Sequence, residues 1–85
     1  MVTATPAWWA VEWQRDEYDC DVARAEIRIG GRMFRISARF DGRVGDWWIE
    51  DEAGNLVFDS QPEWYARRED LLREALDVAG RILGA

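Results

Sequence analysis

The chain contains neither histidine nor lysine, and it has a single cysteine, Cys20, among its 85 residues. These absences remove imidazole metal ligands, Ser-His and Cys-His catalytic relays, Schiff-base chemistry and a phosphate-loop lysine. One cysteine cannot close an intrachain disulfide, and between Asp19 and Asp21 we expect an inert thiol. Carboxylates are then the only acid-base groups left, and nothing in the sequence places them in a cleft. The sequence therefore predicts a protein that is not an enzyme and that uses no cofactor.

Long apolar runs are also missing. No segment approaches the roughly 20 residues that a membrane-spanning helix needs, so we expect no membrane association. Met1–Pro6 carries no basic segment followed by an apolar one, and we expect no secretory signal and a cytoplasmic location. An apolar content of 48% favours a folded globule, and 85 residues suit a single domain spanning 1–85.

The most informative feature present is a regular alternation of apolar and polar residues on both sides of Gly30-Gly31. This pattern predicts a β-hairpin with a two-residue turn. If Ile29 pairs with Arg32, one face of both strands is apolar. That face consists of Ala23, Ala25, Ile27, Phe34, Ile36 and Ala38. The opposite face carries Arg24, Glu26, Arg28, Met33, Arg35, Ser37 and Arg39.

Further strands and one helix are predicted around this hairpin. Alternation over 7–14 suits a strand, although Thr5-Pro6 could instead open a short helix. Strands at 47–51 and 56–58 follow the turn-rich segments 41–46 and 52–55. Ser60 and Glu63 match a capping box, which predicts a helix from Trp64 to Leu83 with one apolar face. The predicted fold class is α+β, an antiparallel four- to five-stranded meander with one C-terminal helix packed on one face.

Two tryptophan pairs, Trp8-Trp9 and Trp47-Trp48, bear on the surface of this sheet. Consecutive strand residues point to opposite faces, so one tryptophan of each pair stays outside the core. We expect the core to contain Trp9, Val11, Trp13, Trp47, Ile49, Leu56 and Phe58. The outer tryptophans and the arginines are residue types enriched at binding hot spots. The candidate partner-binding residues are therefore Trp8, Trp48, Arg24, Arg28, Arg35 and Arg39. The alternative is that these arginines stack on the rings and pair with Glu12, Glu26 and Glu50 in a solvated charge ladder.

Charge is segregated along the chain, whose net charge is -6. Residues 24–43 carry +4, whereas residues 1–23 carry -4 and residues 44–63 carry -6. The flanking acidic segments would repel a polyanion, so we expect no direct binding of nucleic acid. Acids at 17, 19 and 21 imitate the start of a calcium loop. However, Val22 and Arg28 stand where that loop needs glycine and glutamate, so no metal site is predicted.

In size, acidity and sheet-plus-helix layout the chain resembles the small phage-encoded inhibitors that block host defence, anti-CRISPR proteins among them. The resemblance carries over no functional residues. It implies binding to a bacterial nuclease complex or its regulator, by steric block or by mimicry of nucleic acid. Two other functions stay open: a small accessory or assembly subunit, and a nucleic-acid-binding regulator that uses the arginine face. We expect a protein partner, with the chain itself a monomer or a homodimer.

Overall fold

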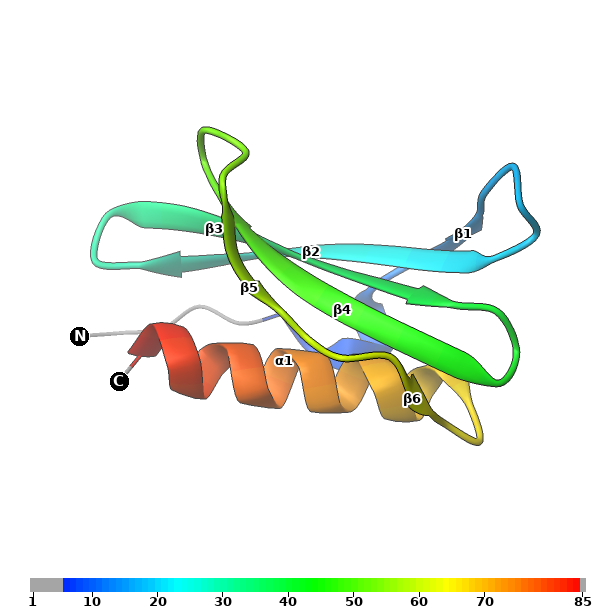
Figure 1. The fold of residues 1–85 in the computed structure, drawn as a ribbon. Coiled ribbons are helices and arrows are strands. Elements are labelled where there is room, and N and C mark those ends of the chain that lie inside the picture. The colour runs from blue at the N-terminus through cyan, green and yellow to red at the C-terminus, as the bar shows by residue number, and fades with distance from the viewer. Residues whose placement is uncertain (1–5, 85) are drawn as a thin grey trace.

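The computed structural model describes residues 6–84 (Figure 1). In chain order the elements are the 3-10 helix η1 (Trp8–Ala10), the strands β1 (Trp13–Arg15), β2 (Asp21–Ile29), β3 (Arg32–Phe40), β4 (Val44–Asp51), β5 (Leu56–Asp59) and β6 (Glu63–Trp64), and the helix α1 (Arg68–Gly84). The predictions that concern Met1–Pro6 fall mostly outside the described residues, and so does Thr5 as a helix cap.

The strands form one antiparallel sheet in which neighbours in sequence are neighbours in space, in the order β1-β2-β3-β4-β5. The short strand β6 pairs with the start of β4. Helix α1 lies along one face of the sheet, and the β4–β5 turn projects from the opposite side (Figure 1). The α+β meander with a C-terminal helix is therefore confirmed. Among residues 6–84, no helix is both long and apolar enough to cross a membrane.

The central hairpin has the predicted register. Ile29 pairs with Arg32 and Ile27 with Phe34, and the pairing continues without a shift to Asp21 and Phe40. Gly30 and Gly31 have φ values of 58° and 78°. Left-handed backbone at both turn positions matches the twist of the flanking strands, and glycine adopts it without steric cost. The Gly-Gly pair thus fixes which side chains of both strands face the helix.

The core lies between this apolar face and α1. The alternate residues of β2 and β3 are buried, as are Trp47 and Ile49 of β4. From the helix, the buried residues are Leu71, Leu72, Ala75, Leu76 and Ala79. The spacing of these residues brings them to one side of α1, as its amphipathic pattern predicts. Around the rim, Val11, Trp13 and Phe58 are partly buried against the core.

The predicted start of the helix is wrong. Helix α1 begins at Arg68, and Glu63 and Trp64 instead pair with Gly45 and Val44 as strand β6. The Ser60 hydroxyl accepts a hydrogen bond from the backbone N–H of Trp47, at 2.8 Å, rather than capping a helix. β4 needs partners for its backbone groups where β5 has ended, and this requirement outweighs the local capping motif. Hence 60–64 completes the sheet edge.

The N-terminal segment combines both alternatives, a 3-10 turn at 8–10 followed by the short strand β1. Strand alternation does not extend through the turn, so the predicted orientation of the first tryptophan pair is wrong. Trp9 is 74% exposed, whereas Trp8 packs against the core beneath the guanidinium of Arg73. Trp8 therefore lies on the helix side of the sheet, away from the predicted arginine face.

The prediction that Leu56 belongs to the core is also wrong, because this side chain is 61% exposed. Phe58 pairs with Ile49, but Leu56 pairs with Glu50, so β5 has one extra residue at a register shift. A bulge of this kind moves the next side chain to the other face of the sheet. Leu56 consequently lies on the side of Glu50 rather than that of Ile49.

Candidate functional site

The face of the sheet that α1 does not cover, here called the helix-free face, holds five of the six candidate residues. Register places on it Arg24, Glu26 and Arg28 of β2, Met33, Arg35, Ser37 and Arg39 of β3, and Asp46, Trp48 and Glu50 of β4. The sixth candidate, Trp8, is on the other side with the helix. The backbone pairing of three strands, β2, β3 and β4, thus brings Trp48 and the four arginines onto one surface.

Three of the arginines on this face remain exposed. Among residues 6–84, the charged side chains of Arg24, Arg28 and Arg35 have no carboxylate oxygen within 4.0 Å and no aromatic ring beneath them. The alternative, a ladder in which these arginines pair with Glu12, Glu26 and Glu50, is therefore not formed at contact distance within residues 6–84. These cations are exposed to solvent and available to an external group.

Arg39 differs from the other three, because the loop before β2 holds it. Its Nε lies 3.1 Å from Asp16 Oδ2, and its guanidinium lies 5.5 Å from the centre of the Tyr18 ring. Asp16 also accepts hydrogen bonds from the backbone N–H groups of Tyr18 and Cys20, each at 2.9 Å. The pKa of Asp16 is lowered by the bond from Cys20 first, with further contributions from Tyr18 and the charge of Arg39. Arg39 is thus a structural contact at the edge of the face.

Trp48 lies near the middle of the helix-free face. It pairs with Ser37 on one side and Asp59 on the other, and its indole Nε1–H donates to Glu50 Oε1 at 2.8 Å. This bond fixes the orientation of the ring. The side chain of Trp48 is half-buried. Ser37 is only 1% exposed although no helix covers this side, so the longer side chains around it must shield it. Trp48 is therefore a preorganised aromatic surface between charged neighbours.

Charge is distributed unevenly across the face. The half formed by β2 and β3 holds four arginines, Arg24, Arg28, Arg35 and Arg39, against one carboxylate, Glu26. The β4–β5 half holds Asp46, Glu50 and Asp59. Burial, and next the nearby charge of Asp59, raise the pKa of Asp46, while Arg39 opposes the rise. The positive and negative halves meet along β3 and β4.

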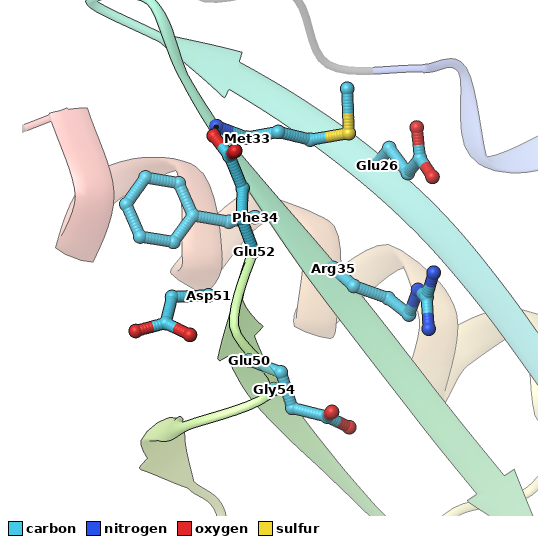
Figure 2. Close-up of a pocket in the computed structure, with 8 residues that line it drawn as sticks. All are labelled: Glu26, Met33, Phe34, Arg35, Glu50, Asp51, Glu52 and Gly54. Carbon is cyan, nitrogen blue, oxygen red and sulfur yellow. Dashed lines mark hydrogen bonds between the residues drawn. The ribbon is translucent and has the colours of Figure 1, made fainter.

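A hollow of about 270 Å³ opens at the turn end of this face, between β3 and the β4–β5 turn. Figure 2 shows the side chains of Glu26, Met33, Arg35 and Glu50 extending to one side, and that of Phe34 to the other. Glu52 Oε1 accepts a hydrogen bond from the backbone N–H of Met33 at 2.7 Å, which ties the turn to β3. The volume is below the range of small-molecule sites, roughly 300 to 1,000 Å³, and suits a single side chain.

Sequence reasoning missed the acidic half of the face and the role of Glu52. Asp46 and Asp59 could have been found from the register, once β4 is extended to Val44 and β5 to Asp59. Glu52 carries no sequence signal, since its bond to Met33 joins residues 19 positions apart. Among the described residues, no group of three or more acidic or cysteine side chains is arranged to hold a metal ion.

Comparisons with known proteins identify no family for this chain. The chain matches no protein-family model, and no similar curated protein or solved structure is found.

Proposed function

We propose that the chain is a non-enzymatic, cytoplasmic protein-binding module that contacts a partner protein through the helix-free face. The observation that carries the proposal is a set of unpaired arginines on the same face as a fixed aromatic ring. Arg24, Arg28 and Arg35 have no ion-pair partner at contact distance in the described part of the chain. Trp48 lies on the same face, held by its bond to Glu50, and Arg35 is its diagonal neighbour on β3. Arginine and tryptophan are enriched among the anchors of protein interfaces, and a ring that is held before binding loses less entropy when the partner binds.

The charge pattern indicates the chemistry of the partner. Carboxylates of the partner would lie over β2 and β3, where the arginines are exposed, and basic groups over Asp46 and Asp59. An apolar group would rest on Trp48 and Met33. The resemblance in size, acidity and layout to anti-defence inhibitors gives the finer form of the proposal: the module inhibits a bacterial nuclease complex, by steric block or by mimicry of nucleic acid.

The test is affinity capture from a bacterial lysate, with the parent chain and its variants as baits. Binding of each variant to the purified partner is then measured. Trp48→Ala and Arg35→Ala should each weaken binding by about 1 to 4 kcal/mol without unfolding the chain. Ile82→Ala is the control, because Ile82 is an exposed apolar side chain on α1, away from the helix-free face. Thermal unfolding of each variant shows that the fold is kept.

Several results would reject this proposal. Losses below roughly 0.5 kcal/mol at Trp48, Arg24, Arg28 and Arg35 alike would exclude the helix-free face as the interface. Capture of nothing but the chain itself would favour a homodimeric accessory subunit. Micromolar binding to DNA or RNA at about 150 mM salt, with a steep loss as salt rises, would favour the nucleic-acid regulator.

A further inference from the structure

A second surface lies on the helix side of the sheet, where three tryptophans surround a hollow of about 430 Å³. Its walls come from η1, from β1 and from the first turn of α1. They comprise Trp8, Trp9, Val11, Glu12, Trp13, Arg68 and Glu69. The proposed interface on the helix-free face uses none of these residues, so this hollow requires its own explanation.

The rings of Trp8 and Trp9 in this hollow meet edge to face and are not stacked in parallel. Trp8 and Trp9 have ring centres 5.6 Å apart and planes at 87°, so the edge of one ring meets the face of the other. Trp8 packs on the core, but Trp9 is 74% exposed and has no partner beyond Trp8 among the aromatic and cation contacts of the described residues. An exposed indole face of this size is costly to leave in water.

The same hollow already holds one guanidinium group. Arg68 lies over the ring of Trp13, with its Cζ 5.3 Å from the ring centre. Its edge nitrogens lie 3.4 Å from Asp21 Oδ2 and 3.7 Å from Glu69 Oε2. A guanidinium that stacks on an indole and has a carboxylate at its edge is a favourable arrangement for arginine. Trp9 and Glu12 offer the same two elements with no cation on them.

From these contacts we propose that the hollow binds an arginine side chain of a partner protein, stacked on Trp9 and paired with Glu12 or Glu69. Charge supports this occupant, since the walls carry two carboxylates, Glu12 and Glu69, against one cation, Arg68, and are therefore net negative. An anionic ligand would be repelled by those carboxylates, and a neutral apolar group would leave them unpaired.

The test is an NMR titration of the intact chain, following the indole N–H signals of its six tryptophans. The probe is Nα-acetyl-arginine amide, and its matched control is Nα-acetyl-citrulline amide, which has nearly the same shape without the charge. The arginine probe should shift the Trp9 signal in a saturable way and bind about two- to fivefold tighter than citrulline, as expected for a cation over an exposed ring. The Trp64 signal should not move.

Variants give the second measurement. With binding followed at the Trp8 and Trp13 signals of the same hollow, Trp9→Ala should abolish it. Glu12→Gln with Glu69→Gln should reduce the preference for arginine over citrulline, whereas Trp64→Ala should change neither. Equal binding of the two probes, or an equal shift at Trp64, would overturn the proposal. Tighter binding of choline than of the arginine probe, with no binding of its uncharged isostere 3,3-dimethylbutan-1-ol, would overturn it in favour of a site for alkylated ammonium groups.

Discussion

Replacement of Gly45 by alanine tests how closely α1 approaches the sheet. Gly45 lies on the helix side of β4, opposite Phe40. A Cβ at this position would lie 2.5 Å from Cδ2 of Leu71, 3.1 Å from the carbonyl oxygen of Arg39 and 3.3 Å from Cδ1 of Phe40. Because Leu71 is fully buried, its methyl group has little free space into which to move. We expect Gly45→Ala to destabilise the fold by about 1 to 3 kcal/mol through overpacking.

Gly80→Ala is the matched control for this substitution. Gly80 lies within α1, nothing is within 4 Å of its Cβ position, and neither glycine has the left-handed backbone that disfavours alanine. The same chemical change should therefore stabilise the protein there, by up to about 1 kcal/mol, because alanine is the better helix former. Urea unfolding of the two variants should give midpoint shifts of opposite sign.

A double-mutant cycle with Leu71→Ala identifies the contact that causes the effect. Leu71→Ala alone should cost about 2 to 5 kcal/mol, since it leaves a cavity between helix and sheet. Combined with Gly45→Ala it should cost at least about 1 kcal/mol less than the sum of the single variants, because the new methyl group enters the vacated space. Additive effects, or a Gly45→Ala variant within about 0.3 kcal/mol of the parent, would refute the close approach of Leu71 to Gly45.

Two further predictions concern the two faces and the turn. Leu76→Ala should cost about 2 to 5 kcal/mol in thermal or urea unfolding and Arg28→Ala under about 1 kcal/mol; a larger loss at Arg28 would mean that the arginines belong to the buried side. Asp51→Asn should lower the urea midpoint at pH 7 but not at acid pH. Asp51 accepts bonds from the N–H groups of Ala53 and Asn55, and chiefly the bond from Asn55 holds its pKa below the ordinary value of 3.8. A carboxyl whose pKa is lowered on folding stabilises the fold above its unfolded pKa, and this contribution is lost as pH falls through the folded pKa. If the urea midpoints of parent and variant differed by the same amount at pH 7 and well below pH 3.8, the assignment would be contradicted.

The parts of the fold that could be predicted are those whose signal is local and repeated. Alternation over two strands and a Gly-Gly turn defines the hairpin, its register and its buried face without further information. The amphipathic pattern of the helix likewise predicts that one side of it is buried, and Leu72, Leu76 and Ala79 lie on that side. Register also placed Trp48 and the arginines on a common surface, which is why most of the candidate site could be found from sequence.

The failures share a physical cause, which is competition between a short local motif and a distant partner. Ser60 and Glu63 have the spacing of a helix cap. However, both residues bind to the edge of β4 instead, Ser60 through its hydroxyl and Glu63 as part of β6. Trp8 follows no strand alternation, because a 3-10 turn directs it toward Arg73 and the core. Whether the arginines form ion pairs could not be predicted either, because cross-strand neighbours such as Glu26 and Arg35 need not approach to contact distance.

The uneven charge of the helix-free face follows from the meander itself. Residues 24–43 carry +4 and residues 44–63 carry -6. An antiparallel meander lays consecutive segments side by side, so this separation along the chain becomes a separation across the sheet, with the boundary between β3 and β4. A partner turned by half a revolution would then place like charges together, which costs free energy that no rearrangement of exposed side chains fully relieves. In the proposed complex, topology would thus select the orientation of the partner, and Trp48, beside that boundary, would contribute affinity in the one orientation that the charges allow.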